Sequence, residues 1–150
     1  MVRIAGRADV GAIVALMAAF YEEDGMPFAG DAARSAVARL VADESLGRVW
    51  IAELDGAVVG YVALTLGYSL EFMGRDAFVD DLYVSPGQRG RGVGRRLLKA
   101  LTEACPAYGV RAVHLEVARA KTHARDLYRG FGFVDHDRLL MTRRIEDESD

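Results

Sequence analysis

The sequence predicts an α/β fold in which a mixed sheet carries helices on both faces. Four segments repeat apolar residues at helical spacing, and short runs rich in β-branched and aromatic residues alternate with them. Two of these runs are joined by an Asp55-Gly56 turn, the usual signal of a β-hairpin. No linker, low-complexity tract or internal repeat divides the 150 residues, so we expect one domain over 1–150.

The first half of the chain is expected to begin with a short strand at 2–4, followed by two helices. Asp9 is a candidate N-cap for the first helix and Asp31 for the second. The hairpin strands then cover 49–54 and 57–66. Residues 67–76 are expected to form an irregular loop. The apolar face of the first helix is formed by Ile13, Leu16, Met17 and Phe20.

The second half alternates strands and helices. A mostly buried strand at 79–84 is broken by Pro86 and leads through a glycine-rich turn into an amphipathic helix from Val93. Pro106 and Gly109 should end that helix. The remaining expected elements are a strand at 110–117, a short helix at 122–129 closed by Gly130 or Gly132, a last hairpin at 133–135 and 139–145, and a frayed acidic tail at 146–150.

Composition restricts the classes of function. A content of 51% hydrophobic and 27% charged residues is ordinary for a soluble globular protein. The net charge of −3 argues against a general nucleic-acid-binding surface. The single cysteine, Cys105, excludes an internal disulfide and agrees with a reducing compartment. No apolar run is long enough to cross a bilayer and no hydrophobic signal segment is evident, so we expect a cytoplasmic protein without a membrane partner.

Residues 88–94 and the helix behind them predict an anion site. Three glycines within five residues, Gly90, Gly92 and Gly94, allow backbone amides to approach a ligand closely. The free amides of the helix's first turn and the helix dipole act in the same direction. Arg89 and Arg91 can add charge-assisted hydrogen bonds. Such a cradle suits a phosphate or diphosphate, although a tight strand-to-helix connection would use the same residues.

Neither common nucleotide fingerprint is complete in this loop. A Walker A loop ends in Gly-Lys-Ser/Thr, whereas Gly94 is followed by Arg95. The dinucleotide fingerprint needs a third glycine where Arg95 stands. The three histidines share no metal-like spacing with Cys105, so we expect no metal site, and no serine nucleophile elbow is present. A nucleotide-binding protein is therefore the weakest of the readings considered.

The order Arg-x-x-Gly-x-Gly at 89–94 resembles the acetyl-coenzyme A loop of the GNAT N-acetyltransferase superfamily. Residues 124–133 are similar to a second pattern of that family, Ala-x-x-Leu-Tyr-x-x-x-Gly-Phe. The two motifs occur in the family's order with a strand between them, and the resemblance covers nearly the whole chain. It implies a mostly antiparallel central sheet of six to seven strands, with acetyl-coenzyme A as co-substrate.

The resemblance also implies how the coenzyme is held. Its pantetheine arm would lie in a slot between the strands of Tyr83 and Glu116, paired with main-chain amides that could also hold the thioester oxygen. Relatives usually carry asparagine where this chain has Lys121, which cannot accept a hydrogen bond. The implied cofactor-binding residues are Leu82, Tyr83, Val84, Arg89, Gly90, Arg91, Gly92, Val93, Gly94, Arg95, Lys121 and Tyr128.

Acyl transfer to an amine needs a proton acceptor for the amine and a proton donor for the leaving thiolate. The family pattern places its acid tyrosine at Tyr128, whose phenol stays protonated at neutral pH. Asp80 and Asp81 are candidate bases, and on a regular pleat they would face opposite sides of the sheet. The resemblance favours Asp80, acting directly or through water. Glu116 is a rival, and an ion pair with an arginine would explain any of these acids equally well.

The resemblance places the acceptor pocket at the connection between the first two helices and at the loop after the third strand. The acids and aromatics there suit a cationic primary amine of a small molecule or peptide, although a solvated acidic helix end has the same composition. The leading hypothesis is direct acetyl transfer from acetyl-coenzyme A to such an amine; the alternative is a non-catalytic acyl-coenzyme A binding or regulatory module. Many relatives dimerise, but the sequence identifies no homodimer interface. The candidate acceptor residues are Tyr21, Glu22, Glu23, Asp24, Tyr68 and Glu71.

Overall fold

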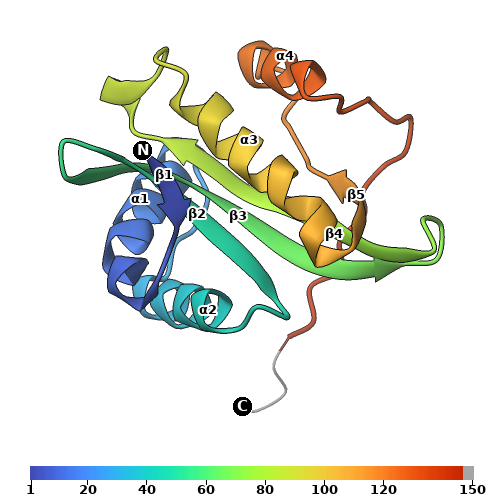
Figure 1. Cartoon of the computed structure of the whole chain (residues 1–150), viewed down its shortest axis with the longest axis horizontal. Coiled ribbons are helices and arrows are strands. Elements are labelled where there is room, and N and C mark those ends of the chain that lie inside the picture. The colour runs from blue at the N-terminus through green and yellow to red at the C-terminus, as the bar shows by residue number, and fades with distance from the viewer. Residues whose placement is uncertain (147–150) are drawn as a thin grey trace.

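One mixed sheet forms the centre of the protein in the computed structural model, which describes residues 1–146 (Figure 1). The strands within that range are β1 (Val2–Ile4), β2 (Gly47–Leu54), β3 (Ala57–Ser69), β4 (Gly74–Val84) and β5 (Val110–His114). They lie side by side in this order, antiparallel except for the parallel pair β4 and β5. The mixed, mostly antiparallel sheet was expected, but five strands in the described chain correct the expected six to seven.

The differences in strands concentrate near the C-terminus and the β3–β4 turn. Residues 133–135 and 139–145, expected as a last hairpin, are not strands in the described chain, and β5 ends at His114 instead of residue 117. Conversely, most of the loop expected at 67–76 is strand, because Tyr68 pairs with Arg75 and Ser69 pairs with Gly74. In each case the segment is a strand only where the backbone of a neighbouring strand is available for pairing. The residues of the segment itself do not encode that neighbour.

Helices cover both faces of the sheet, as expected (Figure 1). Ile13, Ile51 and Tyr61 belong to a core under the first helix pair, whereas Leu97 and Leu101 belong to a core on the other face. The short 3-10 helices are η1 (Arg7–Asp9), η2 (Pro86–Gln88) and η3 (Cys105–Tyr108). One face carries α1 (Val10–Glu23) and α2 (Gly30–Ala42), and the other carries α3 (Val93–Ala104) and α4 (Thr122–Gly130). No helix in the described range is both long and apolar enough to cross a bilayer.

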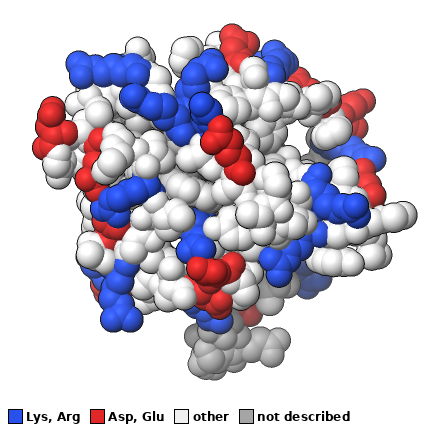
Figure 2. Space-filling model, in the orientation of Figure 1, with Lys and Arg blue, Asp and Glu red and all other residues white. Residues whose placement is uncertain are grey.

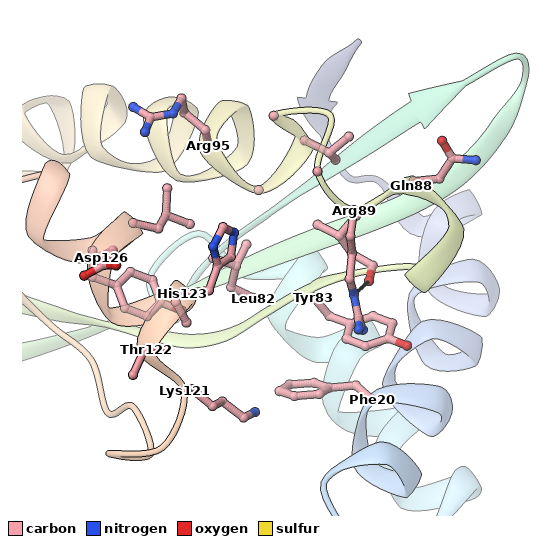
Figure 3. Close-up of a pocket in the computed structure, with 18 of the residues that line it drawn as sticks. Phe20, Leu82, Tyr83, Gln88, Arg89, Arg95, Lys121, Thr122, His123 and Asp126 are labelled. Atoms are coloured by element: carbon pink, nitrogen blue, oxygen red, sulfur yellow. Dashed lines mark hydrogen bonds between the residues drawn. The ribbon is translucent and has the colours of Figure 1, made fainter.

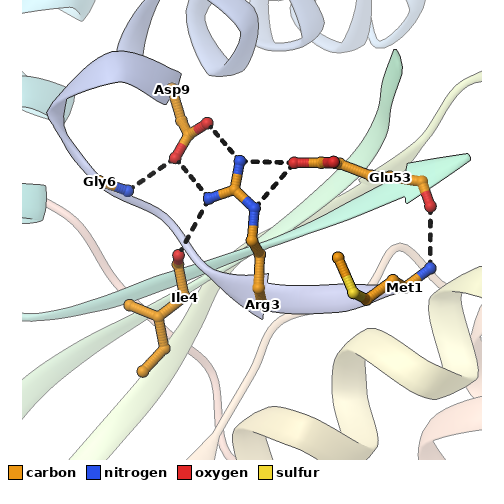
Figure 4. A network of polar contacts seen from close by, with 6 residues as sticks. All are labelled: Met1, Arg3, Ile4, Gly6, Asp9 and Glu53. Atoms are coloured by element: carbon orange, nitrogen blue, oxygen red, sulfur yellow. Dashed lines mark hydrogen bonds and ion pairs between the residues drawn. The ribbon is translucent and has the colours of Figure 1, made fainter. Parts of the chain in front are cut away.

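Asp9 takes a different role from the helix cap that was expected. It occupies the N-cap position of α1 without a side-chain cap bond, and accepts hydrogen bonds from the Arg3 guanidinium at 2.8 and 2.9 Å and from the Gly6 amide at 2.7 Å (Figure 4). Arg3 also donates to Glu53 at 2.8 Å. The Arg3 bonds lower the pKa of Asp9, which is only 8% exposed. This network ties β1 to the start of α1 and to β2. Asp31 likewise lies within the first turn of α2 rather than at its cap.

Divergence of β4 from β5 positions the functional site. The two strands pair only where Arg75–Phe78 of β4 faces Val110–His114 of β5. Beyond Phe78, β4 continues along β3 to Val84, so within the described chain its other edge over 79–84 has no strand partner. This is the slot that was expected between these strands. A register shift between Ala63 and Leu64 also adds an extra residue, Asp80, to β4 as a β-bulge.

Candidate active site

A cavity of about 770 Å³ lies against the free edge of β4 (Figure 3). Its walls come from β4, the glycine-rich loop, the start of α3, the end of α1 and the first turns of α4. Divergence of β4 from β5 is what brings these segments around one space. Of the residues predicted to bind the cofactor, all but Arg91 line it: Leu82, Tyr83, Val84, Arg89, Gly90, Gly92, Val93, Gly94, Arg95, Lys121 and Tyr128.

The glycine-rich loop has the backbone conformation that an anion cradle requires. Gly90 and Gly92 have φ of +79° and +77°, in the left-handed region that favours glycine. Gly92 is the N-cap residue of α3, and its carbonyl accepts the first helical bond from the Arg96 amide at 3.1 Å. The amides of the first turn therefore remain available to a ligand. Figure 2 shows Lys and Arg side chains gathered over this part of the molecule.

Arg89 is held on the wall of the cavity by contacts with β4 and with α1. Its Nε donates to the Val84 carbonyl at 2.9 Å, and its guanidinium pairs with Glu23 at 2.9 Å. The guanidinium also lies over the Tyr83 ring, 5.3 Å from its centre, and the Tyr83 hydroxyl donates to Glu23 at 3.2 Å. Chiefly because of Arg89, the pKa of Glu23 is lowered. A predicted cofactor residue is thus paired with a predicted acceptor residue.

Lys121 repeats this arrangement on the other side of the cavity. Its ammonium binds both carboxylate oxygens of Asp24, at 3.0 and 3.1 Å, and lies 5.8 Å from the centre of the Phe20 ring. Phe20 in turn stacks on Tyr83 with ring centres 5.1 Å apart (Figure 3). The end of α1 therefore contacts both the glycine-rich loop and the start of α4. Phe20 was expected only as a core residue, since helical spacing alone gives no sign of a cavity.

Tyr128 faces the same cavity from α4. Its ring packs edge-on against Phe133, with centres 6.0 Å apart, and against the core below α3. Burial raises its pKa, so the side chain is a neutral phenol near pH 7. Within residues 1–146 its hydroxyl makes no hydrogen bond, which leaves the proton available to a ligand. His123 also lines the cavity; its place in the first turn of the predicted short helix was an available signal that the sequence reasoning missed.

The two acids of β4 lie on the opposite face of the strand, in a recess of about 100 Å³ beneath α1 and α2. Asp81 accepts hydrogen bonds from the Tyr61 hydroxyl at 2.9 Å and the Tyr21 hydroxyl at 3.3 Å. Burial, with the neighbouring charge of Asp80, raises the pKa of Asp81 to about 6. Asp80 is exposed to solvent, but the surrounding protein desolvates it enough to raise its pKa too. Both line the recess, so the expectation of opposite faces was wrong because of the bulge.

The remaining predicted residues line neither cavity. Glu116 lies beyond the end of β5 and is exposed, and Glu22 is exposed on α1. Tyr68 is at the tip of the β3–β4 hairpin with 74% of its surface exposed, and Glu71 there pairs with Arg138 at 3.2 Å. Of the predicted acceptor residues, the structure therefore brings Tyr21 to the β4 acids and Glu23 and Asp24 to the larger cavity.

Comparison with known proteins agrees with this geometry. Residues 13–133 match the Acetyltransferase (GNAT) family model. The chain belongs to the GNAT acetyltransferase family. An integron cassette protein from the mobile metagenome of Cole Harbour Salt Marsh has a solved structure that matches this GNAT chain with a TM-score of 0.87 and 36% identity, covering 97% of this chain and 91% of that one.

Two curated GNAT relatives are similar over part of their length. Thialysine N-epsilon-acetyltransferase from Bos taurus is 35% identical over 78 residues, 52% of this chain and 45% of the relative. L-2,4-Diaminobutyric acid acetyltransferase from Nocardia farcinica is 35% identical over 72 residues, 48% of this chain and 36% of the relative. This GNAT chain thus matches less than half of the length of either relative.

The GNAT family uses acetyl-coenzyme A as its acetyl donor, and the residues of the larger cavity fit that molecule. The glycine-rich loop offers amides and positive charge to a diphosphate. The free edge of β4 offers main-chain groups to the amide-bearing pantetheine arm, as in strand addition to a sheet. The volume of about 770 Å³ is within the range of small-molecule and cofactor sites. The family and coenzyme predicted from the two sequence motifs are confirmed.

Proposed function

We propose that this protein transfers the acetyl group of acetyl-coenzyme A directly to a primary amine of a small molecule or peptide. The observation that carries the proposal is the arrangement around β4. One side of the strand borders the cavity with the glycine-rich loop and Tyr128, and the other side presents Asp80 and Asp81. These groups would serve as a donor site, a proton donor and a proton acceptor around one strand, whose edge between them has no strand partner in the described chain.

Main-chain groups are proposed to make the principal contacts with the coenzyme, and cationic side chains the secondary ones. The amides from Gly90 to Gly94 would bind the diphosphate, because Arg89 is already paired with Glu23 of α1 and Lys121 with Asp24 at the C-cap of that helix. The edge of β4 at 82–84 would bind the pantetheine arm and bring the thioester beside Tyr128. An amide on this edge would stabilise negative charge on the thioester oxygen in the transition state.

The chemical step uses two side chains for proton transfer. As the amine nitrogen forms a bond to the thioester carbonyl carbon, Asp80 accepts the amine proton, directly or through a water molecule. As the carbon–sulfur bond breaks, Tyr128 donates its hydroxyl proton to the leaving thiolate. Asp80 is assigned this role over Asp81 because Asp80 is solvent-exposed, whereas Asp81 accepts two tyrosine hydrogen bonds. Glu116 lines neither cavity.

Transfer is proposed to be direct, without an acetylated enzyme. The thiol of Cys105 is buried, donates to the Leu101 carbonyl at 3.3 Å, and has a pKa raised by burial. A protonated, buried thiol is a poor nucleophile. Bringing the two substrates together at the β4 edge would instead supply much of the rate enhancement, up to roughly 7–11 kcal/mol in well-oriented reactions.

The acceptor is proposed to be a cationic amine. Thialysine and diaminobutyric acid, named for the two curated relatives, each carry an amine besides the α-amino group. In this protein Asp80, Asp81 and Tyr61 form the polar part of the recess beneath α1 and α2, and the Tyr21 hydroxyl donates to Asp81 from outside that lining. Carboxylates with an aromatic ring nearby favour an ammonium group.

The test is an acceptor screen with release of free coenzyme A thiol as the readout. The panel contains thialysine, diaminobutyrate, polyamines, aminoglycosides, lysine peptides, and neutral or acidic amines. Thiol release that requires an amine and produces its N-acetyl derivative is the expected result. Activity confined to neutral or acidic amines would remove the cationic acceptor. Coenzyme A binding without transfer to any amine would favour a regulatory acyl-coenzyme A binding module.

A further inference from the structure

Lysine is rare in this chain, and one of its lysines lines the larger cavity. Of the 19 Lys and Arg residues, only Lys99 and Lys121 are lysines. An arginine guanidinium stays protonated, whereas a lysine ammonium can lose a proton and become a nucleophilic primary amine. Among the described residues that line the cavity, Lys121 is the one whose side chain carries an amine. A group of the kind that the protein is proposed to acetylate is therefore part of its own coenzyme site.

The backbone directs Lys121 to the same cavity as Tyr128. Lys121 is the N-cap residue of α4, and its carbonyl accepts a hydrogen bond from the Arg125 amide at 3.0 Å. Tyr128 follows about two helical turns later, and both side chains line the cavity. One short helix thus presents both a primary amine and the proposed proton donor to the space where the coenzyme would bind.

The Lys121 amine lies toward the end of the cavity where the thioester is proposed to sit. Its side chain points toward Phe20 (Figure 3), and its Nζ is 5.8 Å from the centre of that ring. The Phe20 ring stacks in turn on Tyr83, with centres 5.1 Å apart. Tyr83 belongs to the edge of β4 that is proposed to hold the pantetheine arm. A single aromatic ring therefore links the amine to the strand edge along which the thioester would lie.

The ion pair that holds this amine is a weak restraint. Both carboxylate oxygens of Asp24 accept hydrogen bonds from the Lys121 ammonium, at 3.0 and 3.1 Å. The Lys121 side chain is 48% exposed, and exposed ion pairs of this kind shift an equilibrium by about fivefold at most. Asp24 therefore favours the charged, paired form of Lys121 without excluding the free amine.

We infer that Lys121 is a self-acetylation site, at which the protein transfers the acetyl group of its own bound acetyl-coenzyme A to the Lys121 Nζ. The inference rests on the proposed function, because it uses the same placement of the thioester and of Tyr128. It adds a covalent modification of the protein itself to the transfer to a free amine.

The step balances without any further reactant. The Lys121 ammonium first gives one proton to Asp24 or to solvent. The neutral Nζ then forms a bond to the thioester carbonyl carbon, and the carbon–sulfur bond breaks. The leaving thiolate takes the Tyr128 proton, and the proton that Nζ loses as the amide forms restores Tyr128. The products are Nε-acetyl-Lys121, free coenzyme A thiol and one proton.

Acetylation would change the contacts of the cavity. The acetylated side chain is neutral, so its ion pair with Asp24 and its contact with the Phe20 ring as a cation are lost. The end of α1 thereby loses a tie to the start of α4. An amide nitrogen is not a nucleophile, so the reaction stops after one acetyl group on this residue. The modification is self-limiting and leaves a neutral amide beside the coenzyme.

The first experiment incubates the full chain with acetyl-coenzyme A and no acceptor amine, and follows acetylation by intact mass and peptide mapping. Lys99 is the matched internal control, because its side chain is 67% exposed and is more open to uncatalysed acetylation. Lys121 should be acetylated on the order of 10-fold or more faster than Lys99. The rate per molecule should not depend on protein concentration. Excess free coenzyme A should slow acetylation of Lys121 but not of Lys99.

The second experiment uses three variants. Lys121→Arg keeps a cation for Asp24 but offers no amine, and it should abolish the fast incorporation, whereas Lys99→Arg should leave it unchanged. Asp24→Asn should raise the rate at Lys121 by about two- to fivefold, because the ammonium loses the carboxylate that stabilises it. Circular dichroism and calorimetric coenzyme A binding verify that each variant is folded and binds the donor.

Several outcomes would overturn self-acetylation. They are acetylation of Lys99 as fast as Lys121, a Lys121 rate that free coenzyme A does not lower, and a rate per molecule that rises with protein concentration. Transfer to an added amine while Lys121 stays unmodified would also overturn it, and would leave the proposed function standing. Failure of the chain to bind coenzyme A would overturn both.

Discussion

The two faces of β4 hold sites of opposite chemical character. On the side of α3 and α4, the cavity of about 770 Å³ is bordered by glycines with left-handed backbone and by arginines. On the side of α1 and α2, a recess of about 100 Å³ is lined by two acids and Tyr61 among apolar side chains, and the hydroxyls of Tyr61 and Tyr21 donate to Asp81. The first suits an anion and the second an ammonium group. A single strand thus separates the expected binding chemistry of the two substrates.

The two sites also differ in which segments of the chain form them. Both include residues near the end of α1. The glycines and arginines of the basic site come from one continuous segment, 88–95, whereas the acidic site joins Tyr21, Tyr61 and Asp81 from three elements. The end of α1 joins the two, since Glu23 and Asp24 pair with Arg89 and Lys121 while Tyr21 donates to Asp81. Groups on opposite faces of β4 can act on one reaction only at the strand's free edge.

The largest effect on activity is expected when Asp80, the exposed acid of the acidic side, is replaced. Asp80→Asn should lower kcat/KM by roughly 10²- to 10⁴-fold, the usual contribution of a general base, with little change in coenzyme A affinity. Steady-state thiol release and calorimetric coenzyme A binding measure the two quantities. Glu116→Gln is the matched control, since Glu116 lines neither cavity. A loss with Glu116→Gln and none with Asp80→Asn would transfer the role to Glu116.

A second change tests the proton donor on the basic side. Tyr128→Phe should lower kcat on the order of 10-fold or more, because the leaving thiolate loses its proton source while the aromatic packing against Phe133 is kept. Coenzyme A affinity and the melting temperature should change little. Single-turnover thiol release isolates the chemical step. Unchanged turnover would remove Tyr128 from the mechanism.

A smaller effect is expected from the loop backbone. Gly92→Ala puts a Cβ on a residue with φ of +77°, at a cost of roughly 1 kcal/mol or more. The free variant is expected to relax out of this conformation, and recovering it on binding should lower coenzyme A affinity by about fivefold. Gly87→Ala is the matched control: a Cβ there also meets no atom within 4 Å, but the backbone is not left-handed. Calorimetric titration with coenzyme A compares the two. Equal affinities would show that the loop tolerates a different conformation when bound.

The smallest effect is expected on the pH dependence of stability, which depends on the burial of Asp81 on the acidic side. Burial raises the pKa of Asp81 to about 6, above its unfolded value. The stability that the protonated carboxyl contributes is therefore complete below about pH 4 and is lost as the pH rises through about 6. Asp81→Asn does not titrate, so relative to wild type it should gain about 0.8 kcal/mol between pH 5.5 and 7.5. Urea unfolding at the two pH values measures this. If the difference in the free energy of unfolding between wild type and Asp81→Asn did not change with pH, folding would not raise the pKa of Asp81.

Local sequence determined the parts of this protein that depend on short-range forces. Left-handed glycines at 90 and 92, the helix starting at Val93 and the turn at Gly109 follow from backbone sterics and apolar spacing, which act over a few residues. The family resemblance of the motifs that contain Arg89 and Tyr128 implied that both residues border one site, and both line the larger cavity. The family resemblance rests on the same motifs.

Tertiary structure alone decided the contacts between distant segments. The bulge that turns Asp80 and Asp81 to one face depends on the register between β3 and β4. The pairing of Arg89 and Lys121 with α1 depends on how that helix packs on the sheet. Contacts between distant segments also explain why the described chain has fewer strands than expected. A strand-like sequence such as 139–145 becomes a strand only where another backbone offers hydrogen bonds. Register and packing follow from the sum of many distant contacts, which no local pattern encodes.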